Sequence, residues 1–345
     1  MQRAHDQAES WKKMVMRTQS APGWLSADAP YCDVILSSRY RVMRNLRGFR
    51  FPHHATVDEL LEISRQVLHA GRGHFEAHRR LTGAERDYLV GCRLISPDFA
   101  WQQLGRSVLL DAARECSVMV NEEDHIRLQV ITAGWSIRVA KKVAESALGS
   151  LGKELVFARD DEHSFVAASP YNAGEGKRLS AMLHLIGLAS TKRLPSVLQA
   201  LPTRGLSVRG LFGESSRAVG AFVQVSASSG SQTPFIGACE HLLREERIAR
   251  REVSAETIAA KTRRALEFAL PSRTLSLADA LRVVAWIRWA ACAGVPGHVQ
   301  PRLVDSWLIA LEVPGLDGDF EAGRQRARFI RERIEQDLEM ALRGG

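Results

Sequence analysis

Apolar and polar residues alternate most regularly along residues 117–131. Beyond residue 125, every second residue is apolar: Ile126, Leu128 and Val130. Successive side chains of a β-strand point to opposite faces, so this alternation predicts a half-buried strand. On such a strand one polar face would carry Asn121, Glu123, His125 and Arg127.

An extended strand would separate Glu123 from Arg127 by about 13 Å, at roughly 3.3 Å per residue. That spacing leaves room for a ligand between a carboxylate and a guanidinium. The alternatives are an acidic hairpin tip or a metal site. A tip would be marked by glycine, proline or Asn-Gly, which residues 121–127 lack. Four consecutive ligands on a strand do not face one ion, so we expect a substrate site.

Two other stretches are predicted to be strands that carry arginine. Residues 31–41 place Arg39 and Arg41 on one face, about 7 Å apart. Two cations on one face repel each other unless an anion lies between them, which predicts a phosphate or carboxylate ligand; a nearby acidic side chain is the alternative. Residues 178–185 alternate in the same way and place Arg178 on the polar face.

Two segments are rich in glycine. Residues 169–178 contain Gly-Lys but lack the first glycine of a phosphate-binding loop, and Arg178 stands where Ser or Thr would bind magnesium. This segment is therefore not a Walker loop. Residues 205–215 are predicted to form a loop that carries Arg209 and Glu214. Glycines at this density favour a backbone close to a ligand.

Helical spacing dominates elsewhere. Residues 56–70 begin with a capping box formed by Thr56 and Glu59. Residues 84–110 are predicted to be helix, a loop at Ser96 and Pro97, and more helix. The last part of the chain is predicted to hold helices at 240–252, 276–293 and 321–342. The prediction is therefore an α+β fold, with an antiparallel domain of residues 1–250 and a helical domain of residues 251–345.

Composition narrows the function. The 345-residue chain is 45% hydrophobic and carries a net charge of +8, as expected for a globular protein with an anionic partner. Nucleotide phosphates, nucleic acid or an acidic protein would fit, and a solvated arginine-rich surface is the alternative. A direct nucleic-acid binder is disfavoured, because no aromatic platform or compact basic motif accompanies the charge.

Cysteine usage and the absence of apolar segments indicate the compartment. The five cysteines are scattered without a CxxC pair, which favours a reducing cytoplasm without disulfides or a zinc site. Residues 1–16 lack the apolar core of a signal peptide. No segment approaches the ~20 apolar residues that span a bilayer. We expect a cytoplasmic protein without a membrane partner.

The polar side chains of these segments form a set suited to phosphoryl transfer. It consists of Arg39, Arg41, Arg127, Arg178, Arg209, Glu123 and Glu214. Arginine forks bind phosphate oxygens at two points and stay charged, which suits a triphosphate and its transition state. If the acceptor is a guanidinium, the two glutamates would hold it and take its proton.

Four segments, in matching order, resemble the guanidino (phosphagen) kinase family. They are SSRYR (37–41), NEEDHIR (121–127), PYNAGEGKR (170–178) and VRG (208–210). Further segments are most similar to the bacterial branch of the family, the protein arginine kinases: residues 39–52, 208–215 and 326–333. The resemblance covers nearly the whole chain.

The resemblance implies a saddle-shaped antiparallel sheet flanked by helices, with ATP as donor and Mg²⁺ held mainly by its phosphates. It implies that the five arginines bind phosphate, that Glu123 is the catalytic base with Glu122 beside it, and that Glu214 is a second acceptor-site glutamate. The short lead-in replaces a helical domain of small-molecule phosphagen kinases, which implies an open site for a protein arginine. As partners the resemblance implies protein substrates, a second copy in a homodimer, a zinc-binding activator and protein-degradation machinery.

Two other functions stay open. The first is a kinase of free arginine or another small guanidine. The second is a regulatory or adaptor homologue that binds nucleotide or phosphoarginine with little turnover. Departures from the family pattern motivate the second: Ser169 replaces a cysteine, and Glu175 and Lys177 alter the glycine loop. Gly323 stands where the family has an acidic residue that reads phosphoarginine, which argues against that reading function in this chain.

Overall fold

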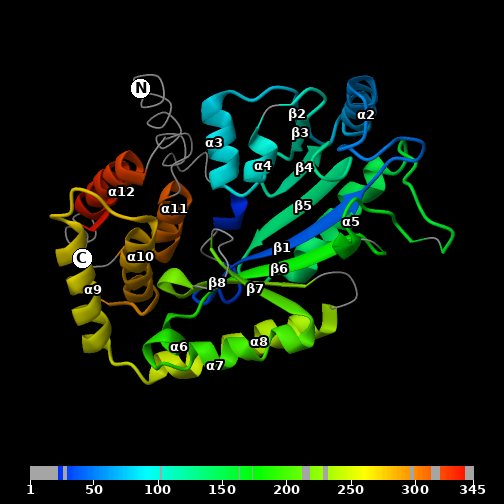
Figure 1. Ribbon diagram of the computed structural model, residues 1–345. Coiled ribbons are helices and arrows are strands. Elements are labelled where there is room, and N and C mark those ends of the chain that lie inside the picture. Colours follow the sequence, from blue (N-terminus) through cyan, green and yellow to red (C-terminus); the bar gives the residue numbers. More distant parts are fainter. Residues whose placement is uncertain are drawn as a thin grey trace.

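One antiparallel sheet organises the protein (Figure 1). The structure is a computed structural model that describes residues 22–25, 29–101, 103–162, 164–172, 174–211, 218–227, 232–295, 299–311 and 319–338. Within these ranges the sheet has eight strands in the order β2-β3-β4-β5-β1-β6-β8-β7. The strands are β1 (Ile35–Arg44), β2 (Glu76–His78), β3 (Ser107–Leu110), β4 (Cys116–Val120), β5 (Ile126–Ala133), β6 (Lys177–His184), β7 (Leu206–Gly210) and β8 (Phe222–Ala227).

Helices flank this sheet. Those before residue 252 are α2 (Val57–Ala70), α3 (Gly83–Gly91), α4 (Pro97–Ala100), α5 (Ile137–Leu151), α6 (Ile186–Ser190), α7 (Leu194–Gln199) and α8 (Gln232–Arg251). Helix α5 packs on β1 and β5, α2 packs on α5 and β4, and α8 packs on β6 and β8. An antiparallel sheet with flanking helices confirms the predicted α+β class.

The local signals at α2 are confirmed. Thr56 accepts a hydrogen bond from the backbone N–H of Glu59, and the Glu59 carboxylate accepts one from the N–H of Thr56. This capping box satisfies two helix-end donors that would otherwise lack partners.

The prediction for residues 84–110 is correct in part. Helices α3 and α4 occupy its first portion, but residues 107–110 form strand β3 instead of a second long helix. Strand β3 pairs with β2 on one side and β4 on the other, and all four of its residues are buried. A short apolar run does not distinguish a strand from a helix, and here the neighbouring strands decide.

The side chains of the central strand β1 point alternately to the face of the sheet that α5 covers and to the opposite, open face. The Ser38 hydroxyl donates to the Gly134 carbonyl at 2.7 Å and accepts the N–H of Ser136, which precedes α5. The side chain of Ser38 therefore lies on the α5 side. Because side chains alternate along a strand, Arg39 and Arg41 point to the opposite face.

The C-terminal part of the chain is helical, in line with the predicted periodicity. It holds α9 (Ala255–Ala269), α10 (Leu277–Cys292), α11 (Pro301–Leu311) and α12 (Asp319–Arg333), with a π-helical turn at Ile334–Leu338. Helix α10 contacts α9, α11 and α12 and is buried around most of its surface, as expected for a central helix. The predicted end of α12 at residue 342 lies outside the described residues, and the boundary at residue 250 stays a prediction.

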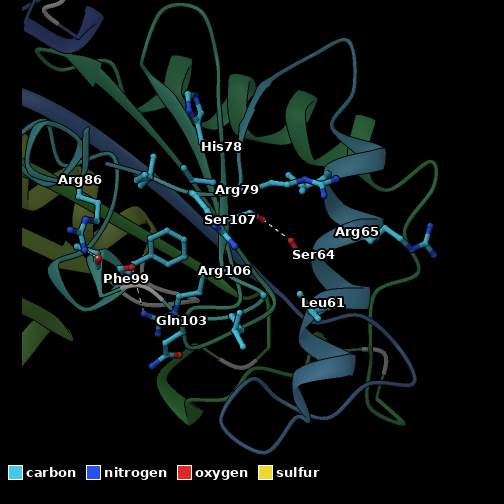
Figure 2. Close-up of a pocket in the computed structure, with 17 residues that line it drawn as sticks. Leu61, Ser64, Arg65, His78, Arg79, Arg86, Phe99, Gln103, Arg106 and Ser107 are labelled. Carbon is cyan, nitrogen blue, oxygen red and sulfur yellow. Dashed lines mark hydrogen bonds between the residues drawn. The ribbon is translucent and has the colours of Figure 1, made fainter. Parts of the chain in front are cut away.

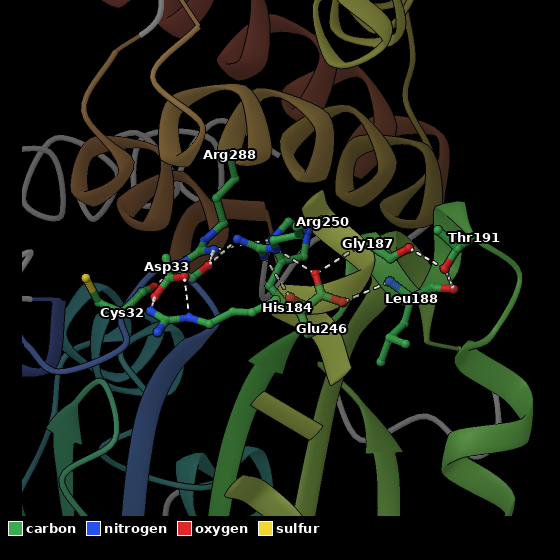
Figure 3. A network of polar contacts seen from close by, with 10 residues as sticks. Cys32, Asp33, His184, Gly187, Leu188, Thr191, Glu246, Arg250 and Arg288 are labelled. Atoms are coloured by element: carbon green, nitrogen blue, oxygen red, sulfur yellow. Dashed lines mark hydrogen bonds and ion pairs between the residues drawn. The ribbon is translucent and has the colours of Figure 1, made fainter. Parts of the chain in front are cut away.

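A buried polar network joins these helices to the sheet (Figure 3). The fully buried Arg288 of α10 pairs with Asp305 of α11 at 2.5 Å and donates to the carbonyls of Cys32 and Asp33, just before β1. Arg250 of α8 also donates to the Asp33 carbonyl, at 3.1 Å. The start of β1 is thus held from two helices. Within the described ranges, every helix is too short or too polar to cross a membrane.

Candidate active site

Six arginines line one cavity of about 240 Å³, which we call the arginine cavity. They are Arg39, Arg41, Arg93, Arg127, Arg178 and Arg209. Over the part of the chain that is described, no Asp or Glu side chain lines it. Val90 of α3 and Pro97 of α4 form part of its wall. The five arginines predicted from separate segments therefore come together on the open face of the sheet.

Strand register explains this convergence. Arg41 of β1 lies directly opposite Arg178 of β6, and Arg209 of β7 lies opposite Gln224 of β8. Directly opposite residues on antiparallel strands share a face of the sheet. Gln224 also accepts a hydrogen bond from Arg39 Nη2 at 3.0 Å, which connects β1 to the pair of strands β7 and β8.

The crowded guanidinium groups perturb one another. Burial, together with the neighbouring arginines, lowers the pKa of Arg39 to about 9 and that of Arg41 well below its ordinary value. Burial and the charges of Arg209 and Arg127 also lower the pKa of Arg178. The Nε atoms of Arg41 and Arg178 are buried and have no hydrogen-bond partner among the described residues. A phosphate chain would supply both the missing charge and the missing acceptors.

Residues 121–125 form a hairpin turn between β4 and β5, so the prediction of a continuous strand is wrong there. Val120 pairs with Ile126 at the end of the hairpin. Asn121 has a φ of +58°, a left-handed conformation that asparagine adopts more readily than most residues. Its Nδ2 donates to the carbonyls of Leu60 and Gly105, each at 2.8 Å. The turn contains no glycine, and the Asn121 side chain holds it to the segments around Leu60 and Gly105.

The turn also corrects the predicted polar face. His125 is buried away from the arginine cavity: its Nδ1 accepts the N–H of Leu46 at 2.9 Å, and its Nε2 lies 2.7 Å from the Arg50 carbonyl. Burial lowers the pKa of His125. His125 therefore fixes the polypeptide after β1 and does not share a face with Arg127.

Glu122 lies next to the cavity. It forms an ion pair with Arg127 and accepts a hydrogen bond from the Ser96 hydroxyl at 2.5 Å. Burial opposes ionisation of Glu122, but the charge of Arg127 and these hydrogen bonds prevail and lower its pKa. The sequence predicts space for a ligand between Glu123 and Arg127. In the structure Arg127 instead forms a direct ion pair with Glu122.

Glu123 has the opposite character. It is exposed at the tip of the hairpin, and partial desolvation followed by the charges of Asp124 and Glu122 raises its pKa. The charges of Arg127 and Arg178 oppose this rise, which places Glu123 within electrostatic reach of the cavity. Two adjacent carboxylates with opposite pKa shifts suit different tasks, one as a fixed anion and the other as a proton acceptor.

The glycine-rich segments differ from their prediction. Arg209 lies in strand β7, not in a loop, because residues 206–210 pair with β8. Glu214, predicted as a second acceptor-site carboxylate, lies outside the described residues. Gly176 has a φ of +59°, and a Cβ there would lie 2.7 Å from the Met43 carbonyl oxygen. This close approach of the glycine to β1 sets the start of β6 and hence the place of Arg178.

Two further residues refine the site. Ser169 is half-buried just before the 3-10 turn at Pro170–Asn172, and its carbonyl accepts the N–H of Asn172 at 2.9 Å. Arg93 was not predicted, because it lies in the loop after α3, where no alternation marks its direction. Its φ is +60°, and its carbonyl accepts a hydrogen bond from Gln129 at 2.7 Å. Neither the left-handed φ of Arg93 nor its hydrogen bond with Gln129 can be recognised from the sequence.

Comparison with known proteins agrees with this chemistry. The sequence profile of the ATP:guanido phosphotransferase family, C-terminal catalytic domain, matches residues 52–231. A protein-arginine kinase of Moorella thermoacetica is 32% identical over 329 residues, which cover 90% of this chain and 93% of that protein. One of Symbiobacterium thermophilum is 30% identical over 353 residues, which cover 94% and 99%.

Solved structures share the fold. A lombricine kinase crystal structure matches with a TM-score of 0.57 and 18% identity, covering 68% of this chain and 71% of that one. The substrate-free duplicated taurocyamine kinase of Schistosoma mansoni matches with a TM-score of 0.55 and 20% identity, covering 68% and 39%. At these identities the likeness establishes the architecture alone.

Proposed function

The chain belongs to the ATP:guanido phosphotransferase family, and from this membership we infer that it is a protein-arginine kinase. It would transfer the γ-phosphate of ATP to the guanidinium of arginine side chains in proteins. The structural observation that supports the inference is the arginine cavity beside Glu122 and Glu123, whose pKa values shift in opposite directions. The relatives named protein-arginine kinase support the choice of acceptor.

The arginine cavity would bind the phosphates of ATP. At about 240 Å³ it is smaller than the roughly 300–1,000 Å³ of pockets that enclose whole drug-sized ligands, so it suits the triphosphate portion. The buried Nε atoms of Arg41 and Arg178 lack an acceptor among the described residues, and the phosphate oxygens would supply one. Charge on the equatorial oxygens increases towards the transition state, and fixed cations around them stabilise it.

The hairpin carboxylates would serve the acceptor. A guanidinium nitrogen of the substrate attacks the γ-phosphorus, the new N–P bond forms, and the bond to the β–γ bridging oxygen breaks as ADP leaves. The proton lost from that nitrogen passes to Glu123, whose raised pKa suits a base. Glu122, held by Arg127 and Ser96, would orient the guanidinium. Glu214 is proposed as a second acceptor-site carboxylate.

Magnesium would enter with the nucleotide. The family resemblance implies that the phosphates of the nucleotide themselves would hold the Mg²⁺. When bound there, the ion neutralises phosphate charge and helps to align the γ-phosphate. The arginines would then bind the phosphate oxygens that the ion does not contact.

The location and the partners of the protein are proposed from the family resemblance. We propose that the protein works in the cytoplasm on proteins with exposed arginine. A homodimer, a zinc-binding activator and protein-degradation machinery stay predictions of the family resemblance.

The decisive experiment is to incubate the protein with Mg-ATP and casein, and to map phosphate by mass spectrometry that preserves acid-labile groups. We expect phosphoarginine from the wild type and a loss of at least about 100-fold in Glu123→Gln, with ATP affinity kept, because a general base contributes about that much. Full turnover in Glu123→Gln would remove this residue from the role of base. Modification of free arginine alone would favour a small-guanidine kinase, and ATP binding without product a regulatory homologue.

A further inference from the structure

A second cavity, of about 460 Å³, lies where strands β2 and β3 meet α2 and α4 (Figure 2). We call it the edge cavity, because β2 is the outermost strand on this side of the sheet. Its walls come from α2, α3, α4, strands β2 and β3 and the segments next to these strands. It is separate from the arginine cavity and is not used by the reaction described above.

The edge cavity is basic. The arginines that line it are Arg65, Arg79, Arg80, Arg86 and Arg106, and His78 lies among them; within the described ranges no Asp or Glu side chain lines it. Arg65 is already paired with Glu62. Arg79 and Arg80 are exposed and, over the described part of the chain, have no acidic or hydrogen-bonded partner. Arg86 donates through Nη1 to the Ala100 carbonyl, but its buried Nε lacks an acceptor there. Arg79 and Arg80 thus remain available to an anionic ligand, and Arg86 adds positive charge to the wall.

Apolar side chains accompany this charge. Leu61 and Leu104 line the edge cavity and are 48% and 66% exposed, and Trp101 beside it is 75% exposed. Phe99 forms another part of the wall (Figure 2). Exposed large apolar residues grouped around one hollow are typical of a binding surface. A ligand that suits both features carries carboxylates and at least one hydrophobic group.

The two cavities share a wall. Ser96 and Pro97, at the start of α4, line the arginine cavity. Phe99 and Ala100, at the end of the same helix, line the edge cavity. Arg106 of the edge cavity donates through Nε to the carbonyl of Asn121 at 3.2 Å, next to Glu122. A polypeptide seated in the edge cavity therefore lies one short helix away from the catalytic carboxylates.

We propose that the edge cavity docks an acidic segment of the protein substrate, with a hydrophobic side chain against Leu61 and Leu104 and carboxylates against Arg79 and Arg80. The volume and the apolar wall fit several amino-acid residues better than a lone phosphate. The shared wall fits a substrate chain that also reaches the active site. This inference rests on the proposed protein-arginine kinase function.

The test uses two synthetic peptides with the same target arginine, one flanked by Asp and Leu residues and one by Ser and Gly. For the wild type, we expect kcat/KM to be about tenfold higher with the acidic peptide, mainly through KM, since charge complementarity favours encounter. The double variant Arg79→Glu, Arg80→Glu is expected to lose that preference. Arg47→Glu, Arg72→Glu is the matched control, because it makes the same charge change at exposed arginines outside both cavities.

The apolar wall is tested separately by Leu104→Asp, at a position exposed enough to tolerate the change. It is expected to raise KM for the acidic peptide, with the affinity for ATP unchanged. Equal kcat/KM for both peptides, or equal losses in the cavity variant and its matched control, would overturn the docking site and leave the kinase function intact. If the wild type modifies neither peptide nor casein, the kinase function fails first, and binding of a fluorescent acidic peptide without arginine still tests the cavity.

Discussion

Glu122 and Glu123 are adjacent in the chain but face different surroundings. The buried carboxylate of Glu122 lies against Arg127, which lowers its pKa. Partial desolvation, followed by the charges of Asp124 and Glu122, raises the pKa of Glu123. The hairpin turn directs the two side chains to these different surroundings, and the pKa values of the two carboxylates differ for that reason.

This separation predicts the pH dependence of the reaction. A base must be deprotonated, so kcat/KM should fall as pH drops through the pKa of Glu123, and the acid limb should lie above the ordinary value of 4.5. Stability that Glu122 gains from Arg127 is present above its unfolded pKa and is lost only as pH falls through its lowered folded pKa. A pH–rate profile with circular dichroism at each pH measures both. An acid limb at or below 4.5, or one that coincides with unfolding, would contradict the assignment.

Arg178 provides the residue-scale test of phosphate binding. Arg178→Ala removes a buried donor with no protein partner, and we expect the affinity for ATP to fall about tenfold or more, since a charge-assisted hydrogen bond is worth about 1.5–3 kcal/mol. Isothermal titration calorimetry measures this, with Arg72→Ala as the exposed control. An unchanged dissociation constant would remove Arg178 from the nucleotide site.

At the scale of elements, the β4–β5 hairpin is the critical unit. It joins two neighbouring strands, carries the two proposed acceptor-site carboxylates, Glu122 and Glu123, and is anchored by Asn121 to the segments around Leu60 and Gly105. These anchors belong to the region of the edge cavity. The hairpin therefore links backbone geometry to the position of the proposed base.

Two substitutions at Asn121 separate its roles. Asn121→Gly keeps the left-handed backbone but loses both side-chain hydrogen bonds, and we expect it to cost about 1–3 kcal/mol of unfolding free energy. Asn121→Ala should cost about 1–2 kcal/mol more, because a Cβ disfavours that conformation. Urea unfolding measures both, and kcat should fall in the same order. Equal stability of the three proteins would show that the turn does not depend on this side chain.

At the scale of the whole molecule, a fully buried arginine connects the helical part to the sheet. Burial alone would lower the pKa of Arg288, but the charge of Asp305 prevails and raises it. Two of its guanidinium nitrogens reach the carbonyls of Cys32 and Asp33 at 2.7 and 2.8 Å (Figure 3). The strand that follows these carbonyls carries Arg39, so the helices support the placement of the site.

Arg288→Met leaves the carboxylate of Asp305 buried without its partner, and we expect a loss of about 3–5 kcal/mol in unfolding free energy. Replacing both residues, as Arg288→Met with Asp305→Leu, should recover part of that loss, because no uncompensated charge remains. Denaturant unfolding of the two variants gives the comparison. A single variant as stable as the wild type would show that the network does not hold the two parts together.

The sequence by itself determined the elements whose signals are local. Alternation identified the strands around Arg39 and Arg178, and the capping pattern located the start of α2. Side-chain period and helix caps depend on neighbours a few residues away, so they are legible in one chain. The segments that resemble the guanidino kinase family gave the chemistry, and the match to the family profile confirmed it.

Only the tertiary structure decided how these pieces meet. The turn at Asn121, the strand at residues 107–110 and the place of Arg93 depend on partners far along the chain. Register between β1 and β6 puts Arg41 opposite Arg178, and no local pattern specifies that pairing. Sequence periodicity fixes which way a side chain points within its own element. Strand pairing and loop anchoring fix which side chains from different elements share a cavity.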